Sequence, residues 1–224
     1  PIFSNLILAD EINRSPAKVQ SALLESMQEK QVTIGEESFK LELPFLVLAT
    51  QNPIDQEGTY PLPEAQRDRF MMKLNISYPS KEEELKIMQR MSDLNFKNTV
   101  KTVLSKKDIN SVQGEINSVS ISESIQKYII ELVNATRDPS SVGLDDLRNY
   151  ISFGASPRAS INLSLASKAN AFLSNRDYVM PDDIKEIAND VLNHRIILNY
   201  EAEAEGVRPE SIIRKILEKV EINS

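Results

Sequence analysis

The sequence predicts an α/β fold followed by an all-helical part. Two short apolar runs, residues 5–9 and 45–49, are typical of strands buried on both faces in a parallel sheet. A segment with helical features follows each run, and this alternation is typical of α/β architecture. Beyond residue 78 the apolar residues recur at helical spacing, and no further run of comparable apolar density follows. We therefore predict two domains, residues 1–78 and residues 79–224.

The first domain begins with the strand at residues 5–9. Ser15 and Pro16 then predict a helix start, with the serine as the N-cap and the proline at the first helical position. Apolar and polar residues alternate on both sides of Gly35–Ser38. That pattern predicts a β-hairpin across residues 31–43.

The rest of the first domain repeats the alternation of strand and helix. A second strand is predicted at residues 45–52, followed by a loop of proline, glycine and polar residues at 53–62 and a short helix at 63–70. The run MMKLNIS at residues 71–77 predicts a third strand. With this strand the predicted sheet domain is complete.

The second domain is predicted from helix-start signals. Ser80 is followed three residues later by Glu83, which is a capping-box pattern, and the later segments open with a serine or a proline. The predicted helices are Ser80–Met91, Ser122–Arg137, Pro157–Ser174, Pro181–Asn193 and Pro209–Val220.

The composition excludes several classes of function. The 224 residues carry a net charge of −7, which argues against a nucleic-acid-binding surface as the main role. There are no cysteines, so disulfides, thiolate zinc sites and catalytic thiols are excluded. The apolar runs are too short to cross a bilayer. A chain without cysteine suits a reducing compartment, and we expect a cytoplasmic protein.

Two adjacent acids at the end of the first strand are the first sign of a site. Ligands of open α/β sheets bind at the carboxyl ends of the strands, where Asp10 and Glu11 are expected. An apolar strand that ends in Asp-Glu has the form of a Walker B motif, in which the first acid holds Mg²⁺ and the second orients or deprotonates water. Equally, the strand could simply leave the core and meet solvent. Asn52 ends the next strand, where it could position a water or serve only as a turn residue before Pro53.

Three segments together resemble the MoxR family of AAA+ ATPases: LILADEINRSPAKVQSALLESMQEKQVTIG, FLVLATQNPIDQEGTYPLPEAQRDRF and GASPRA. The resemblance covers essentially the whole chain and is most specific between residues 5 and 79. It implies that residues 1–78 are the C-terminal part of a P-loop NTPase core with a parallel sheet. Residues 79–224 would be the all-α lid domain.

The resemblance also implies a role for each matching residue. Asp10 would be the Mg²⁺-associated acid, Glu11 the acid that activates water, and Asn52 the sensor 1 residue that reads the γ-phosphate. Arg69, in DRF, would be the arginine finger that reaches a neighbouring subunit's nucleotide, and Arg158, in GASPRA, would be sensor 2. Planar guanidinium groups suit such positions because each can meet two phosphoryl oxygens at once.

Simpler interpretations of the basic residues stay open. Arg69 could form a surface ion pair with Glu64 or Asp68, a contact worth little, and Arg67 is a competing finger two residues earlier. Arg158 follows the first residue of a predicted helix, where a cation opposes the helix dipole and a phosphate would relieve the cost. The single histidine, His194, is expected to be a hydrogen-bonding group near a helix end.

One part of the expected nucleotide site is missing from the sequence. No G-x-x-x-x-G-K-[S/T] loop occurs, and none of the six glycines precedes Lys-Ser or Lys-Thr. In the family this loop lies upstream of Walker B, so we expect the chain to be the C-terminal portion of a longer protein. We also expect it to bind ATP poorly and not to hydrolyse it alone, and to expose unpaired sheet edges and apolar faces.

For the intact protein, the resemblance implies Mg²⁺-dependent ATP hydrolysis in a ring, with six subunits expected. It further implies a chaperone-like action on a protein client, possibly one with a von Willebrand factor A domain, and residues 31–43 are our candidate pore-facing or client-facing hairpin. Two alternatives remain: a magnesium-chelatase-like ATPase subunit, and a non-catalytic interaction module. We expect neither nucleic acid as a partner nor a membrane span.

Overall fold

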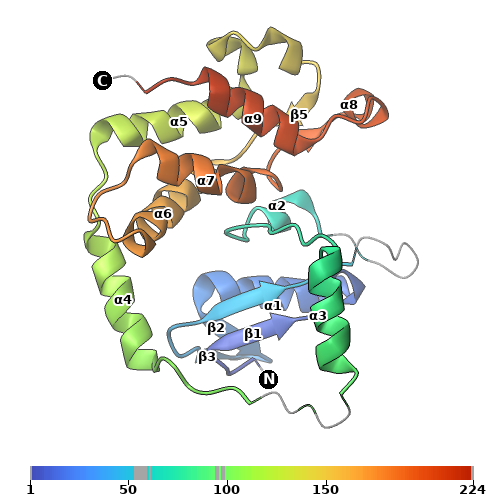
Figure 1. The fold of residues 1–224 in the computed structure, drawn as a ribbon, viewed down its shortest axis with the longest axis vertical. Coiled ribbons are helices and arrows are strands. Elements are labelled where there is room, and N and C mark those ends of the chain that lie inside the picture. The colour runs from blue at the N-terminus through green and yellow to red at the C-terminus, as the bar shows by residue number, and fades with distance from the viewer. Residues whose placement is uncertain (1, 53–59, 61, 94–95, 97–98, 223–224) are drawn as a thin grey trace.

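The computed structural model describes residues 2–52, 60, 62–93, 96 and 99–222. Its elements form a small α/β unit and a larger cluster of helices, with α2 (Glu64–Arg67) lying between them (Figure 1). The predicted loop at residues 53–62 falls mostly outside the described residues. None of the helices in the described ranges is both long enough and apolar enough to span a membrane.

A two-stranded parallel sheet forms the centre of the α/β unit. β1 (Leu6–Ala9) pairs with β4 (Leu46–Ala49), with Leu6 opposite Leu46 and Ala9 opposite Ala49. The helix α1 (Ala17–Glu29) packs Leu23 and Met27 against a small core that includes Val47. The predicted first two strands and their parallel pairing are therefore confirmed.

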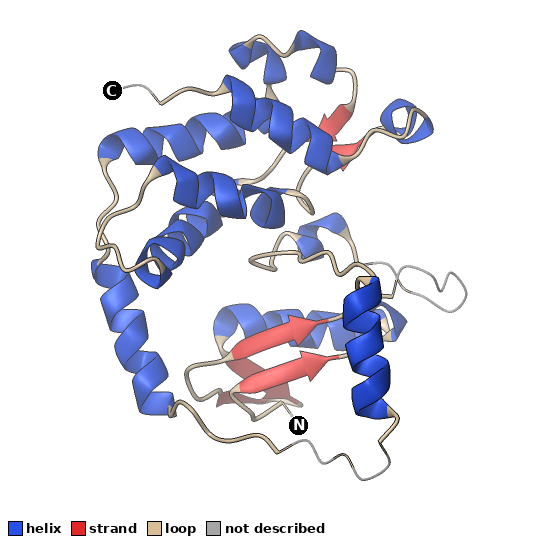
Figure 2. Ribbon diagram, in the orientation of Figure 1, coloured by secondary structure: helices blue, strands red, loops and turns tan. Residues whose placement is uncertain are grey.

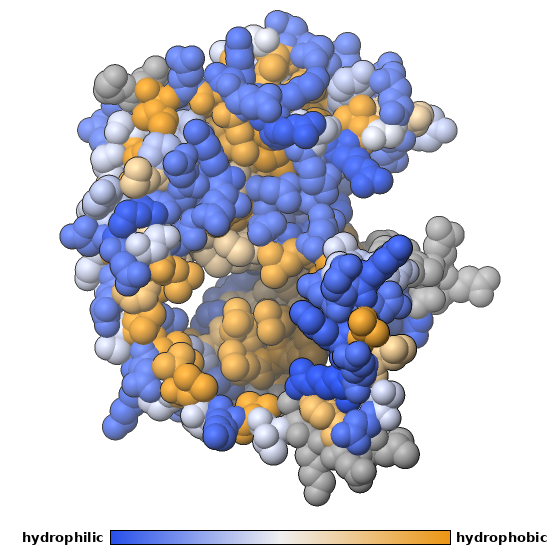
Figure 3. Space-filling model, in the orientation of Figure 1, coloured by the Kyte–Doolittle hydropathy of each residue, from blue (hydrophilic) through white to orange (hydrophobic). Residues whose placement is uncertain are grey.

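The opposite face of this sheet is apolar and exposed. Leu6, Leu8, Leu46 and Leu48 are between 51% and 65% exposed, and apolar side chains gather over the two strands in the space-filling view (Figure 3). The expectation of an exposed apolar face is confirmed for the described residues. The expectation of burial on both faces is wrong there, because α1 and the neighbouring hairpin cover only one side.

The hairpin and the start of α1 match the predictions to different degrees. β2 (Gln31–Ile34) and β3 (Glu37–Lys40) form the expected antiparallel pair, and Gly35 has the positive φ of 65° that its turn requires.

Ser15, however, is not the N-cap of α1. It is extended, as residues before proline tend to be, and it closes the 3₁₀ turn η1 (Ile12–Arg14), so the helix begins one residue after Pro16.

The third predicted strand is absent. The segment from Met71 to Ser77 has no strand conformation, and the backbone N–H of Lys73 donates to the carbonyl of Asp190 at 2.8 Å. A strand needs a neighbouring strand for its backbone groups, and here the helical cluster supplies that hydrogen bond instead. The segment thus ties the α/β unit to the helices.

The helical cluster contains four of the five predicted helices and some elements that were not predicted, whereas α3 lies apart from it and has no buried residue (Figure 1). The core is built by α5, α6, α7 and α9, around fully buried side chains such as Leu132, Leu163 and Ile212 (Figure 2). The expectation of no further strand is wrong, since two short strands pair here. The predicted helices are α3 (Lys81–Met91), α5 (Glu123–Arg137), α6 (Pro157–Leu173), α7 (Pro181–Leu192) and α9 (Pro209–Lys219); the additional elements are α4 (Lys106–Ser118), η2 (Pro139–Val142), η3 (Asp145–Leu147), α8 (Tyr200–Ala204) and the strands β5 (Ile151–Phe153) and β6 (Ile197–Leu198).

Candidate functional site

The carboxyl ends of β1 and β4 are joined by a threonine that the sequence did not single out. The Thr50 hydroxyl donates to Asp10 Oδ1 at 2.5 Å and accepts from the backbone N–H of Glu11 at 2.9 Å. The Thr50 carbonyl in turn accepts from the N–H of Ile12 at 3.0 Å. Parallel pairing of the strands brings these groups together, and the result fixes one carboxylate oxygen of Asp10 at the edge of the sheet.

Glu11 has a strained backbone. Its φ of 48° and ψ of 52° are left-handed, a conformation that costs a non-glycine residue roughly 1–3 kcal/mol. Arg14 lies beside it, with 3.2 Å between Arg14 Nε and Glu11 Oε2. The sharp turn directs the chain away from the sheet immediately after Asp10, so the two acids occupy the strand end rather than extending the strand.

Asn52 lies at the same edge. The side-chain amide of Asn13 donates to the Asn52 carbonyl at 3.3 Å, which ties the end of β4 to the turn that follows β1. The structure thus places Asp10, Glu11 and Asn52 at the carboxyl ends of two adjacent strands. That the Asn52 side-chain amide lies close to the two acids stays a prediction, since the contact with Asn13 is made by the Asn52 backbone carbonyl.

The two candidate finger arginines differ in exposure. Arg69 is exposed, and its Nη1 donates to the Gln28 side-chain oxygen on α1. Arg67 is half-buried, and its Nε has no hydrogen-bond partner among the described residues. An exposed guanidinium can reach a neighbouring molecule, so the geometry favours Arg69 over Arg67.

Arg158 lies in the first turn of α6, next to residues 68–75, which we call the finger segment because they include the candidate finger Arg69. Ser156 caps the helix, and Arg158 Nη1 lies 3.0 Å from Asp68 Oδ2, the carboxylate directly before Arg69 in the chain. Burial alone would raise the pKa of Asp68, but hydrogen bonds from Ser156 and Arg158 and the charge of Arg195 hold it below its usual value. The structure therefore pairs Arg158 with the ionised carboxylate that directly precedes Arg69 in the chain, whereas the Arg69 side chain contacts Gln28 on α1.

Comparisons with known proteins identify the family. Residues 1–72 match the model described as "ATPase family associated with various cellular activities (AAA)", and residues 146–216 match the AAA lid domain. Chaperone MoxR1 of Mycobacterium tuberculosis is 47% identical over 98% of this chain and 58% of its own length, and the uncharacterized protein YeaC of Bacillus subtilis is 46% identical over 99% and 67%. A crystal structure of a candidate ATPase from Cytophaga hutchinsonii superposes with a TM-score of 0.96 at 63% identity, covering 100% of this chain and 68% of that one.

The chain belongs to the MoxR family of AAA+ ATPases. It has the AAA+ fold, with a parallel sheet and a helical lid, as the sequence predicted. It spans 58% of the length of MoxR1 and 67% of that of YeaC, so it corresponds to part of these MoxR-family relatives.

The residues at the strand ends suit the hydrated Mg²⁺ that such ATPases use. Mg²⁺ characteristically takes one or two carboxylates and completes its octahedron with water and phosphate oxygens. Asp10 supplies one such carboxylate, and the described part of the chain holds no cluster of three acids or histidines that would make an all-protein cage. For nucleotide, the fit is partial, since this MoxR-family sequence has groups for the hydrolysis side but no phosphate-binding loop.

Sequence reasoning missed the residues that hold the two parts of the candidate site in this MoxR-family chain. Thr50 and Gln28 carry no local signal, because their partners lie about forty residues away in the chain. Arg195 and His194, at the end of α7, both contact the segment that begins at Asp68. A cation at a helix C-terminus is expected from the helix dipole alone, so the sequence offered no reason to connect Arg195 with the site.

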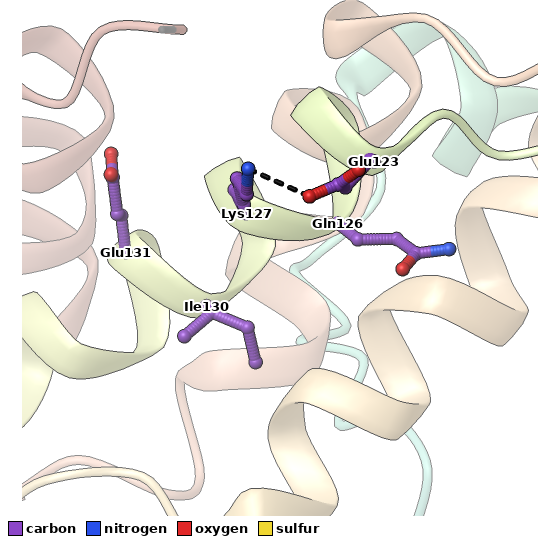
Figure 4. Close-up of a pocket in the computed structure, with 5 residues that line it drawn as sticks. All are labelled: Glu123, Gln126, Lys127, Ile130 and Glu131. Atoms are coloured by element: carbon purple, nitrogen blue, oxygen red, sulfur yellow. Dashed lines mark ion pairs between the residues drawn. The ribbon is translucent and has the colours of Figure 1, made fainter.

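One other surface hollow does not resemble a site. It is lined only by residues of α5, and Figure 4 shows Glu123 and Lys127 paired along one side of that helix. Their 2.7 Å ion pair has the ordinary i,i+4 spacing of a solvent-facing helix. The candidate site therefore remains the strand-end edge together with the finger segment.

Proposed function

We propose that this chain carries the hydrolysis side of an ATPase site, and that the intact protein couples Mg²⁺-dependent ATP hydrolysis to remodelling of partner proteins. The observation that supports this best is the placement of Asp10, Glu11 and Asn52 at the carboxyl ends of the paired strands β1 and β4, where Thr50 bonds both acids and Asn13 bonds the Asn52 carbonyl. The relatives support it as well, since one of them is named a chaperone. The role of the intact protein goes beyond what residues 1–224 contain.

In this proposal the two acids divide the work. Asp10, held by Thr50, would bind Mg²⁺, and Glu11 would accept a proton from the attacking water at its carboxylate. Bound nucleotide would supply the phosphoryl group under attack. The Asn52 amide would orient the water through hydrogen bonds without adding charge.

The basic residues would stabilise the charge of the phosphoryl group. Arg69 is exposed, so it can act on nucleotide bound to a neighbouring subunit, as an arginine finger does. Arg158 would act as sensor 2, and it pairs with Asp68, the residue directly before Arg69 in the chain. A finger of this kind requires an oligomer, and we propose a cytoplasmic ring of six subunits.

The client and its contact surface are part of the same proposal. A protein with a von Willebrand factor A domain is the client class implied by the resemblance. The β2–β3 hairpin is a plausible contact element because its residues are largely exposed, including Ile34 and Phe39. No observation in the described residues favours metal chelation or a purely structural role over ATP hydrolysis.

The direct test is Glu11→Gln in a polypeptide that carries these residues together with a phosphate-binding loop. We expect kcat to fall by roughly 100-fold or more while nucleotide still binds, because only proton transfer is removed. Glu29→Gln, an exposed change on α1, is the matched control and should leave kcat unchanged. Turnover at the unsubstituted rate in the Glu11 variant would contradict the assignment, and measurable hydrolysis by residues 1–224 alone would contradict their proposed inactivity.

A further inference from the structure

The finger segment is held by a buried arginine at the end of α7. The Arg195 side chain is only 1% exposed. Its Nε donates to Asp68 Oδ1 at 3.0 Å, and its Nη2 donates to the Asp68 carbonyl at 3.0 Å and the Phe70 carbonyl at 2.6 Å. Its Nη1 donates to the carbonyls of Met71, at 3.2 Å, and Val191. Four of these five contacts are to residues 68–71, the residues on either side of Arg69.

Neighbouring groups strengthen the attachment. His194 is buried, and burial is the main cause that lowers its pKa to about 4, so the ring is neutral at pH 7 and its Nε2–H can donate to the Phe70 carbonyl at 3.1 Å. The N–H of Lys73 donates to the Asp190 carbonyl at 2.8 Å. We call these contacts, made by Asp190, His194 and Arg195 to residues 68–73, the finger latch. They attach the segment to the lid helix α7.

The chemistry of Arg195 suits a latch rather than a general structural role. A planar guanidinium has five fixed N–H donors, and here they meet a carboxylate and several backbone carbonyls at once. A lysine would keep the positive charge beside Asp68 but has a single nitrogen to share among these acceptors. The position therefore specifies where the backbone of residues 68–71 lies, and with it the direction of the Arg69 side chain.

We propose that Arg195 is the positioning residue of the arginine finger, and that the finger latch makes Arg69 and Arg158 move with the lid as one unit. Arg158 belongs to the lid helix α6, and Asp68 joins it to Arg195 through its two carboxylate oxygens. A rotation of the lid would then move the guanidinium groups of Arg69 and Arg158 in the same direction at the same time. The role of Arg69 in hydrolysis comes from the proposed function, whereas the mechanical coupling does not depend on it.

The coupling is tested first without nucleotide. The chain has no cysteine, so spin labels can be attached at two introduced cysteines alone. The pair Glu64→Cys and Lys185→Cys measures the distance from α2, which leads directly into the finger segment, to the lid. The pair Lys127→Cys and Lys185→Cys measures a distance inside the lid. In the unsubstituted background we expect narrow distance distributions for both pairs.

Two latch variants are compared with a matched control. Arg195→Lys and Asp68→Asn should each broaden the finger-to-lid distribution and leave the distribution inside the lid narrow, which also shows that the lid is folded. Arg137→Lys alters a lid arginine whose Nε donates to the Ala155 carbonyl at 2.7 Å rather than to any residue of the finger segment, and it should broaden neither distribution. A finger-to-lid distribution that stays narrow in both latch variants overturns the proposal.

The kinetic consequence is tested in a polypeptide that also carries a phosphate-binding loop. Arg195→Lys should lower kcat by roughly 10- to 100-fold, as misplaced catalytic groups do, with KM for ATP within about twofold. Arg69→Ala is the reference. If Arg69→Ala lowers kcat and Arg195→Lys does not, Arg195 does not position the finger; if Arg69→Ala itself has no effect, the proposed function of Arg69 is wrong while the spin-label distances still decide the coupling.

Discussion

Acidification from pH 7.5 to pH 5 is expected to destabilise the fold through His194. Burial is the largest cause that lowers its pKa to about 4, and the charges of Arg195 and Lys73 act in the same direction. The hydrogen bond to the Phe70 carbonyl and the charge of Asp68 oppose the shift without cancelling it. In the unfolded chain the imidazole has its ordinary pKa. At pH values between the two pKa values, the imidazole is therefore mostly protonated in the unfolded state and mostly neutral in the folded state.

The size of the effect follows from the two pKa values. At pH 5 the unfolded imidazole, with an ordinary pKa of about 6.5, is ~97% protonated, whereas the folded one, with a pKa of about 4, is ~10% protonated. Integrated from pH 7.5 to pH 5, this difference in bound protons lowers the free energy of unfolding by about 2 kcal/mol. The contribution of neutral His194 to the free energy of unfolding is fully present above pH 6.5 and is lost as the pH falls toward 4.

The assay is urea unfolding at a series of pH values between 7.5 and 5. This is the only histidine in the chain. The half-buried carboxylate of Asp68 and the buried one of Asp183 have pKa values below their usual range, so their contributions are lost at lower pH. The variant His194→Gln keeps an N–H donor for the Phe70 carbonyl but does not titrate. Between pH 7.5 and pH 5 its free energy of unfolding should fall by about 2 kcal/mol less than that of the unsubstituted protein. Equal losses in the two proteins would refute the reasoning.

Two further predictions concern packing in the helical cluster, both read from the free energy of unfolding. Leu163→Ala removes a fully buried side chain of α6 and should cost about 2–5 kcal/mol, whereas Leu165→Ala on the same helix, where the side chain is 48% exposed, should cost less than about 1 kcal/mol. Gly154→Ala would place a Cβ 2.3 Å from the Thr136 carbonyl oxygen and should cost at least about 1–3 kcal/mol; Gly114→Ala, in an open position inside α4, should instead stabilise by up to about 1 kcal/mol, and a reversed order would contradict the prediction.

Local sequence signals predicted most helices correctly because their starts are set by neighbouring residues. The capping box at Ser80 and Glu83 forms as expected, with the serine N–H 2.8 Å from the glutamate carboxylate. α4 was missed although it also has a capping box, Ser105 with Asp108. Its interior contains asparagine, serine and glycine, which weaken the helical signal, and its apolar residues gain their contacts from α6, a distant part of the chain.

Strands were harder to predict because pairing is not local. The run at residues 71–77 has the composition of a strand, but its backbone bonds to α7. β5 and β6 pair over only a few residues, and α6 and α7 separate them in the chain. The domain division at residue 78 remains a prediction, and the bonds from residues 68–75 to the lid show how strongly the finger segment is shared between the two parts.

The candidate site shows the same contrast between features that follow from local sequence and contacts that depend on distant parts of the chain. Asp10, Glu11 and Asn52 were predicted to meet because parallel strands present their carboxyl ends at one edge, a rule that needs only the order of the elements. The groups that orient them, such as Thr50, depend on the strand register, in which Ala9 lies opposite Ala49. Register is fixed by packing across the sheet and could not be read from either strand alone.

Asp68 resolves the one feature of the site that looked unfavourable in the sequence. A cation in the first turn of a helix is unfavourable beside the positive end of the helix dipole, and this suggested that Arg158 binds a phosphate. In the structure the Asp68 carboxylate already lies there, accepting from the Ser156 hydroxyl at 2.8 Å and from Arg158 at 3.0 Å. The helix start therefore has its anion without nucleotide, and any phosphate that Arg158 binds must compete with a carboxylate that Arg195 holds in place.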